Sequence, residues 1–319
     1  MRGARGRQRA VRGPHPGGPV RMRPEPRLPA PSPGTDPGVF AAAGGAGSGV
    51  ALPRTAAALV WQGLCADWGV WGREPEAAGI FAVECRGGVV GAWWRGPTGQ
   101  MADQIWVPDP PASDPEPWLR RAAAGPGGTE LRLPAAVGGA RWVAAALRNG
   151  YRLVEVDPLM ALALDAARPD GAPAGPPAPR AGAAGPVASG PVADAAEYEA
   201  ALAVIESCFG GPRPLSRFFA PRGAARVYLA RWAGAPAAAA SACRDPASPA
   251  VRIYSVSTRP AYRRRGLARA LLLHVLAAEA RAGAGLAGLR TVDALVPYYE
   301  RIGFRVVGRA QRFRRAPDP

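Results

Sequence analysis

Residues 262–276 read YRRRGLARALLLHVL, and this stretch carries the strongest structural signal in the chain. Three arginines and Gly266 come directly before a leucine-rich segment with helical spacing. The segment before them, VRIYSVST at 251–258, is β-branched and aromatic enough to form a strand. Because the first N–H groups of a helix lack internal partners and carry partial positive charge, this strand–glycine turn–helix order predicts an anion site. Phosphate is the usual ligand of such a turn.

The segments around this turn predict a mixed α/β layer fold for residues 188–316. Asp194 is placed to cap a helix that has Tyr198, Leu202 and Ile205 on one face. The turn helix is expected to end near Ala282, before two glycines. The expected elements are a helix over 195–208, strands over 226–232, 237–243 and 251–258, a helix from the turn, a strand over 289–292, a helix over 295–301 and a strand from 304.

Two motifs in this half occur in an informative order. Arg263-x-x-Gly266-x-Ala268 lies at the start of the turn helix, and Tyr299-x-x-x-Gly303-Phe304 follows later. Each motif is weak alone, but their order, spacing and strand context agree. Together they resemble the GNAT superfamily of N-acetyltransferases, in which the first motif reads (Q/R)-x-x-G-x-(G/A). The resemblance implies an α/β fold with a mixed, mostly antiparallel sheet flanked by helices, and acetyl-CoA as co-substrate.

The resemblance also implies roles for individual residues. The pyrophosphate of acetyl-CoA would lie against the turn, which comprises Arg263, Arg264, Arg265, Gly266, Leu267, Ala268 and Arg269. Main-chain groups of Val256, Ser257 and Thr258 would bind the pantetheine arm. A neutral amine would attack the thioester directly, and Tyr299 would protonate the departing thiolate. The alternative for Tyr299 is a tyrosine packed in the core.

The general base is not defined by the resemblance. An amine acceptor is mostly protonated at neutral pH, so some group must take its proton. Many GNAT relatives use a carboxylate on the strand before the turn, but residues 253–258 contain none. Asp293, Glu206 or an ordered water chain are the alternatives.

Residues 52–166 form a second predicted piece, which holds eight of the nine tryptophans. Tryptophans at this density favour a packed core over a ligand cleft. Residues 80–85 and 89–94 predict a hairpin that turns at Gly87-Gly88.

An internal repeat links the two pieces. Leu147–Val154 resembles Glu300–Val307, since both contain a glycine, an aromatic residue, an arginine and a strand-like segment in that order. The first piece lacks the (Q/R)-x-x-G-x-(G/A) signature. It is therefore expected to be a degenerate GNAT-like or accessory domain, as in tandem GNAT proteins. The C-terminal piece is expected to bind acetyl-CoA by itself.

Composition defines the rest of the organisation. Residues 1–51 predict a disordered basic tail, within which Met22 is a candidate start, and 167–187 predict a Pro/Gly-rich linker that extends toward Gly190. All 40 basic residues are arginine, and the net charge is +16. Residues 191–319 carry 20 arginines against 9 acids, which suits an anionic partner such as a nucleotide cofactor or nucleic acid.

Several protein classes are not supported by the sequence. No run of 18 apolar residues and no secretory signal is present, so no membrane association and a cytoplasmic location are expected. No metal site is expected, because Cys65, Cys85, Cys208 and Cys243 form no CxxC pair.

The sequence predicts an N-acetyltransferase that acts on a primary amine of unknown class, as a monomer or homodimer. The alternative is a non-catalytic GNAT-derived module that binds nucleic acid or a protein partner through its basic surface. Its contacts would be Arg222, Arg226, Arg231 and the Arg312–Arg315 cluster. Few aromatic residues are interleaved with these arginines, so nucleic acid is the less favoured partner.

Overall fold

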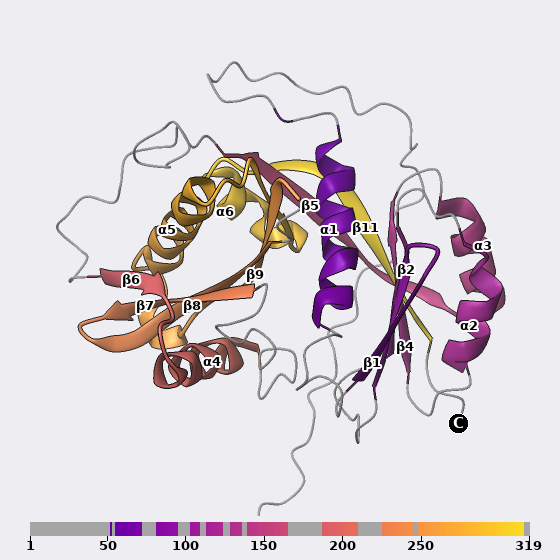
Figure 1. Ribbon diagram of the computed structural model, residues 1–319, viewed down its shortest axis with the longest axis horizontal. Helices are drawn as coiled ribbons and strands as arrows, with labels where there is room; N and C mark the ends of the chain where they lie inside the picture. Colours follow the sequence, from indigo (N-terminus) through magenta and orange to yellow (C-terminus); the bar gives the residue numbers. More distant parts are fainter. Residues whose placement is uncertain are drawn as a thin grey trace, which may run out of the picture. The chain divides into compact units, whose positions relative to one another are not determined.

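The structure is a computed structural model that describes residues 52, 55–71, 81–94, 103–108, 113–123, 128–135, 139–164, 187–209, 225–244 and 248–315. These residues form one sheet of eleven strands in the order β1-β2-β3-β4-β11-β5-β10-β9-β8-β7-β6. Only two neighbouring pairs, β3 with β4 and β9 with β10, are parallel. The predicted α/β class with a mixed, mostly antiparallel sheet and flanking helices is therefore confirmed (Figure 1).

Both halves of the chain have the same order of elements: helix, three strands, helix, strand, helix, strand. The N-terminal half comprises α1 (Ala56–Trp71), β1 (Phe81–Arg86), β2 (Val89–Trp94), β3 (Asp103–Trp106), α2 (Pro115–Ala123), β4 (Thr129–Pro134), α3 (Ala140–Arg148) and β5 (Arg152–Ala163). The C-terminal half comprises an additional edge strand β6 (Val187–Pro191), then α4 (Ala195–Phe209), β7 (Ala225–Trp232), β8 (Ala235–Arg244), β9 (Ala250–Thr258), α5 (Leu267–Arg281), β10 (Leu286–Arg290), α6 (Val296–Glu300) and β11 (Arg305–Arg315). The repeated order agrees with the predicted duplication.

The two halves exchange their last strands. Strand β5 of the first half lies between β10 and β11, and β11 of the second half lies between β4 and β5. The β5–β11 pairing is symmetric, since Arg152 pairs with Arg314 and the equivalent Arg305 pairs with Ala161. The two similar sequence segments are the α3–β5 and α6–β11 junctions, so the short repeat marks a local two-fold symmetry.

This exchange does not fit the expectation that the C-terminal half would bind acetyl-CoA by itself. Both neighbours of β11 in the sheet, β4 and β5, come from the N-terminal half. Strand β10 also pairs with β5 on one side. Removing residues 52–164 would leave β11 without either of its partners, so the sheet of the C-terminal half depends on the first half.

The predicted linker ends earlier than expected. Residues 1–51 and 165–186 lie outside the described residues, but Val187–Pro191 form β6 and pair antiparallel with β7. The segment is extended, and its backbone groups satisfy the edge of β7 even though its side chains are small. Composition alone predicted a loop here because glycine and proline are rare inside strands.

Local signals explain the remaining elements of the C-terminal half. The carboxylate of Asp194 accepts a hydrogen bond from the N–H of Glu197 at 2.8 Å, and Glu197 accepts one from the N–H of Ala193 at 3.0 Å. This reciprocal pair fixes the start of α4, as predicted. The predicted apolar face of the helix is buried, with Tyr198, Leu202 and Ile205 in the core.

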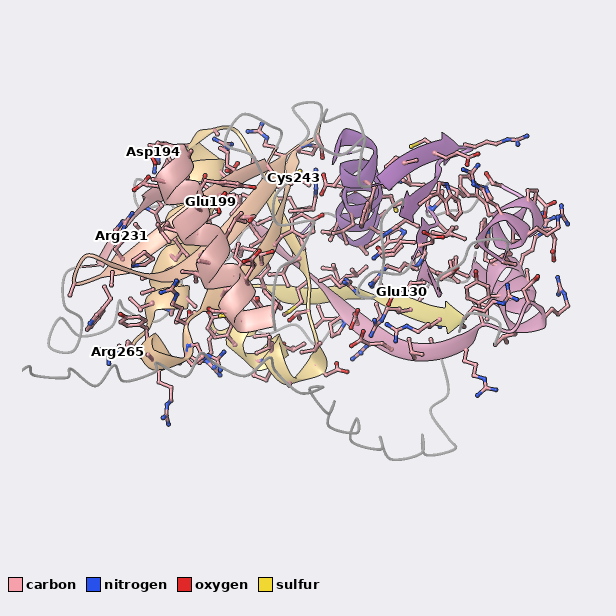
Figure 2. The ribbon with its side chains drawn as sticks, turned by 90° about the horizontal axis from the view of Figure 1, so that it is seen from below. Glu130, Asp194, Glu199, Arg231, Cys243 and Arg265 are labelled. Atoms are coloured by element: carbon pink, nitrogen blue, oxygen red, sulfur yellow. The ribbon has the colours of Figure 1, made fainter. Side chains whose placement is uncertain are left out.

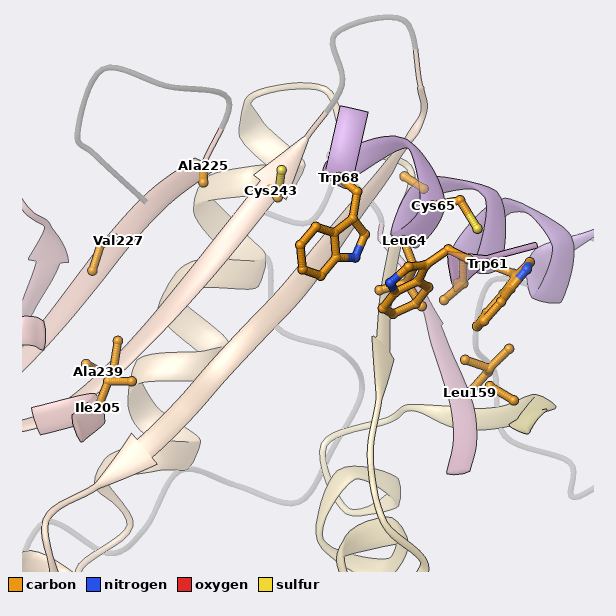
Figure 3. Close-up of a cluster of buried hydrophobic side chains, with 14 of the residues drawn as sticks. Trp61, Leu64, Cys65, Trp68, Leu159, Ile205, Ala225, Val227, Ala239 and Cys243 are labelled. Atoms are coloured by element: carbon orange, nitrogen blue, oxygen red, sulfur yellow. The ribbon is translucent and has the colours of Figure 1, made fainter. Parts of the chain in front are cut away.

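The tryptophans of the first half pack in cores, as predicted. Figure 3 shows Trp61 and Trp68 of α1 in a cluster that also includes residues of β5, β7 and β8. The ring of Trp106 lies 5.5 Å from that of Trp61 and 6.0 Å from that of Trp68, measured between centroids. The buried tryptophans are Trp61, Trp68, Trp93, Trp106, Trp118 and Trp142. The side chains of Trp71 and Trp94 lie outside the described set.

Helix α1 packs directly on strands of the other half. A Cβ atom placed on Gly288 of β10 would lie 2.4 Å from a methyl carbon of Val60. One placed on Gly63 of α1 would lie 2.6 Å from Cδ of Arg252 on β9. These glycines let the helix approach the sheet where β9 and β10 meet. None of the described helices is long and apolar enough to cross a membrane.

Candidate active site

Strands β9 and β10 separate partway along their length. Their parallel pairing covers Ala250–Arg252 against Leu286–Gly288 and then stops, although β9 continues to Thr258 and β10 to Arg290. On its other side β9 stays paired with β8 as far as Thr258. The edge of residues 253–258 that faces β10 is therefore free of strand pairing in the described part of the chain.

A bulge in β9 coincides with this separation. Between the pairs Ser241–Tyr254 and Ala239–Ser257, β9 contains two residues and β8 contains one. The first of the two, Ser255, has a positive φ of 54°, and the Ser257 hydroxyl donates to its carbonyl at 2.8 Å. Such bulges bend a strand and increase its local twist, which directs β9 away from β10. This bulge could not be predicted from the sequence, because a serine between strand-forming residues is compatible with a regular strand.

The predicted turn connects this opened strand to α5. Arg264 and Gly266 have positive φ values of 62° and 77°, and α5 begins at Leu267 without a side-chain cap. The first helical hydrogen bond runs from the N–H of Ala270 to the carbonyl of Gly266. The N–H groups of Leu267 and Ala268 thus lie at an uncapped helix start, where helix geometry gives them no internal acceptor. Arg263–Gly266 are exposed, so an anion can reach them.

The arginine side chains of the turn are oriented by local contacts. Arg263 donates from Nε to the carbonyl of Thr258 at 3.1 Å. The guanidinium of Arg265 lies over the rings of Trp232 at 5.0 Å and Tyr262 at 5.8 Å. Figure 2 labels Arg265. The Thr258 carbonyl also accepts from the Cys208 thiol at 3.2 Å, so this predicted pantetheine contact already has two partners.

Tyr299 lies on α6 and is buried in the core of the second half, to which residues of α5 also belong. Its ring contacts those of Tyr298 and Phe304, with centroid distances of 5.0 and 5.8 Å. Burial raises the pKa of Tyr299 to about 12, so the phenol is protonated at neutral pH. Tyr298 differs, because its hydroxyl is buried without a hydrogen-bond partner among the described residues. Burial also raises the pKa of Tyr298, and the nearby charge of Arg269 opposes that rise.

The two carboxylates named from the sequence as possible bases have different surroundings. Asp293 is exposed and accepts two hydrogen bonds from Arg309, and Glu206 lies half-buried on α4. Two carboxylates that sequence reasoning missed contact residues of β9 and β10 directly. Asp67 bonds to Tyr254 of β9, and Asp157 pairs with Arg290 of β10. Among the described residues, no three histidine, cysteine or acidic side chains group as a metal site would require.

The described part of the equivalent segment in the first half has a different chemistry at its helix start. Strand β3 leads to α2 through a segment that includes Pro108 and Asp114 and ends at Pro115. The Asp114 carboxylate accepts from the N–H of Glu116 at 3.4 Å and from Arg141 at 3.0 Å. A carboxylate therefore already sits at this helix start. By the repeat alignment, Ala146 stands where Tyr299 stands in the second half.

Comparison with known proteins bears on the C-terminal half and on the fold. Residues 193–316 match the family model described as an acetyltransferase (GNAT) domain, in line with the resemblance drawn from the motifs of this half. No curated protein sequence matches the chain.

Three solved structures are similar to the chain to different degrees. A GCN5-related N-acetyltransferase from Kribbella flavida is 22% identical with a TM-score of 0.55, over 81% of this chain and 96% of that one. One from Sphaerobacter thermophilus is 20% identical with a TM-score of 0.49, over 84% and 95%. A tandem GNAT protein from the clavulanic acid biosynthesis pathway is 15% identical with a TM-score of 0.49, over 75% and 80%. The first of these spans both halves, so the fold of the whole described chain is of this kind.

The arginines that the alternative function would use are largely engaged within the protein. Arg226 pairs with Glu279 at 2.7 Å, and Arg231 pairs with Glu197 at 3.3 Å. Arg312 and Arg314 both pair with Glu130. Arg222 lies outside the described residues. These internal pairs reduce the support for a basic nucleic-acid surface, since the four described arginines named above already have carboxylate partners.

Proposed function

We propose that the protein transfers an acetyl group from acetyl-CoA to a primary amine by direct attack. The observation that carries this proposal is the uncapped start of α5, with its left-handed turn at Gly266, next to a strand whose edge is free. The turn offers N–H groups and arginines to the pyrophosphate, and the free edge of β9 offers main-chain groups to the pantetheine arm. Figure 1 shows α5 and β9 within the C-terminal half.

The reaction requires little covalent chemistry from the protein. The neutral amine nitrogen bonds to the thioester carbonyl carbon and releases one proton to water, the carbon–sulfur bond breaks, and the sulfur leaves as a thiolate that takes a proton from an acid. The acid then recovers a proton from water, so the products are a neutral amide and the CoA thiol. Holding the amine and the thioester together supplies much of the acceleration. Tyr299 is the proposed proton donor, since its buried phenol stays protonated at neutral pH. The proposed acyl donor is acetyl-CoA, and the proposed setting is the cytoplasm, without a membrane or nucleic-acid partner.

Binding of acetyl-CoA is expected to depend on Gly266. At about 100 times its dissociation constant, a ligand adds roughly 2.7 kcal/mol of stability, which corresponds to a rise of roughly 5 °C in melting temperature. In Gly266→Asp this rise should vanish, because a carboxylate would stand where the pyrophosphate belongs and the left-handed φ would be strained. Thermal melts of the full chain with and without acetyl-CoA measure the effect.

Gly283→Asp is the matched control for this experiment. Gly283 follows the opposite end of α5, also has a positive φ, and its nearest neighbour for an added Cβ is Arg244 at 3.5 Å. This variant should keep the full rise with acetyl-CoA. An equal rise in wild type and Gly266→Asp would remove the cofactor assignment, and with it the proposed function.

A further inference from the structure

A group of charged side chains lies on the face of the sheet that α1 covers, where the strands of the two halves meet. We call its four arginines the arginine cluster: Arg132 of β4, Arg290 of β10, Arg312 and Arg314 of β11. Its carboxylates are Glu130 of β4 and Glu155 and Asp157 of β5. Figure 2 labels Glu130 beside β5 and β11. The group therefore exists only because β5 and β11 are exchanged between the halves.

Positive charge exceeds negative charge in this group. Glu130 alone accepts from three arginines, at 2.7 Å from Arg132, 3.0 Å from Arg312 and 2.9 Å from Arg314. Asp157 pairs with Arg290, and Glu155 pairs with Arg312 at 2.6 Å. Four guanidinium groups thus share three carboxylates, so one further anion would balance the group.

Two donors of the arginine cluster also lack acceptors. The Nε–H groups of Arg132 and Arg312 are buried and have no hydrogen-bond partner among the described residues. The Arg132 side chain is only 10% exposed and lies over the ring of Trp106 at 5.1 Å. Buried donors without acceptors are rare and costly, so the arginine cluster has hydrogen-bonding capacity that the described residues do not use.

Electrostatics support the same conclusion. Burial lowers the pKa of Arg132, the nearby charges of Arg290 and Arg312 add to the fall, and Glu130 and Asp157 oppose it, with a net pKa of about 9. A bound anion would stabilise the charged form of this guanidinium. Arg290 and Arg312 remain 28% and 24% exposed, so a small anion can approach them from solvent.

The group lies beside the opened strands of the proposed active site. The last paired residues are Arg252 of β9 and Gly288 of β10, which both face α1. Tyr254 follows Arg252 by two residues on β9, and Arg290 follows Gly288 by two residues on β10, so both lie on the same face of the sheet as α1. Arg290 is therefore beside the place where β9 and β10 separate. Asp157 of β5 and Arg312 of β11 lie on strands further from β9. Tyr299 and α5 belong to the core on the opposite face.

We propose that the acceptor amine carries an anionic group, a carboxylate or a phosphate, that the arginine cluster binds. The amine would enter on the α1 face between β9 and β10 while its anionic group contacts Arg290, Arg312 and Arg132. Guanidinium forks match both anions with two parallel hydrogen bonds. This inference rests on the proposed acetyl transfer, and it assigns the N-terminal half a part in the acceptor site through β4 and β5.

Matched amine pairs test the inference with the full chain. The pairs are 4-aminobutyrate with butylamine and O-phosphoethanolamine with ethanolamine, with turnover followed by loss of the thioester absorbance of acetyl-CoA. The anionic member of at least one pair should have a kcat/KM about 10-fold higher or more. In Arg312→Gln that ratio should fall about 10-fold, through KM. The pair that discriminates identifies the anion.

Two variants on the same strand serve as controls. Arg309→Gln removes an exposed arginine of β11 that pairs with Asp293 outside the group, and it should leave the ratio unchanged. Arg312→Lys keeps the charge and should retain part of the preference. Thermal melts of each variant confirm that the fold is intact.

A second readout needs no turnover. Trp106 lies under Arg132, so tryptophan fluorescence should respond saturably to the anionic amine in the presence of CoA, and the response should require Arg312. Equal use of both members of every pair, or no Arg312-dependent response, would mean that the cluster only joins strands. Failure to bind acetyl-CoA would instead overturn the proposed function, so the two failures are distinct.

Discussion

Tyr299→Phe is expected to lower turnover about 10²-fold or more while leaving acetyl-CoA affinity nearly unchanged. The substitution removes one oxygen and keeps the ring that packs against Tyr298 and Phe304, so the fold should be preserved. The phenol acts mainly as the carbon–sulfur bond breaks, and its raised pKa of about 12 keeps its proton available at neutral pH. Steady-state kinetics should use an acceptor for which chemistry limits the rate.

Tyr298→Phe is the internal control for that experiment. The two side chains project about 100° apart around the helix axis, so they do not serve the same position. The buried hydroxyl of Tyr298 has no partner among the described residues, which makes it the competing donor. If Tyr298→Phe is the slower variant, the role belongs to Tyr298. Full turnover in both variants would mean that solvent protonates the thiolate.

Asp67→Ala is expected to destabilise the protein by about 3–5 kcal/mol. Asp67 is fully buried on α1 and accepts from both Nε and Nη2 of Arg252, from the Tyr254 hydroxyl and from the Cys243 thiol. Removing the carboxylate leaves the guanidinium of Arg252 buried without its counter-charge. Urea unfolding of the full chain should show a lower midpoint with an unchanged slope.

Two further variants test whether the loss of stability comes from the buried charge of Arg252. Asp293→Ala removes a carboxylate from the exposed pair with Arg309 and should change stability by less than about 1 kcal/mol. The double variant Asp67→Leu/Arg252→Met replaces the whole buried pair with apolar groups and should recover most of the loss. A loss below about 1 kcal/mol in Asp67→Ala would show that the pair does not hold α1 against β9.

Much of the second half could be predicted from local sequence. The Asp194 cap, the apolar face of α4 and the glycine turn before α5 are local signals, and each acts within a few residues. The exchange of β5 and β11 could not be predicted, because the helix–glycine–strand pattern predicts a strand but does not determine which other strand it pairs with. Only the similarity between Leu147–Val154 and Glu300–Val307 indicated that two equivalent strands exist.

Some residues of the site could also be predicted from the sequence, and others could not. The residues of the turn at 263–269 are contiguous, so a sequence motif can identify them. Arg132, Asp157 and Arg290 come from three strands that the sheet order brings together. A weak signal was present, since charged and apolar residues alternate in Glu130-Leu-Arg132 and Arg312-Phe-Arg314. Such alternation indicates a strand with one polar face, but it does not say which charges on other strands lie opposite.

The exchange of strands has a consequence for how the protein is made. Strand β11 is synthesised after the other ten strands of the sheet, yet it must insert between β4 and β5, and its Arg314 meets Glu130 across 184 positions of sequence. Until it emerges, the facing edges of β4 and β5 are unpaired, and open edges are templates for aggregation. A nascent chain that stops before Arg305 would keep both edges exposed, so translation must pass β11 before either half can close.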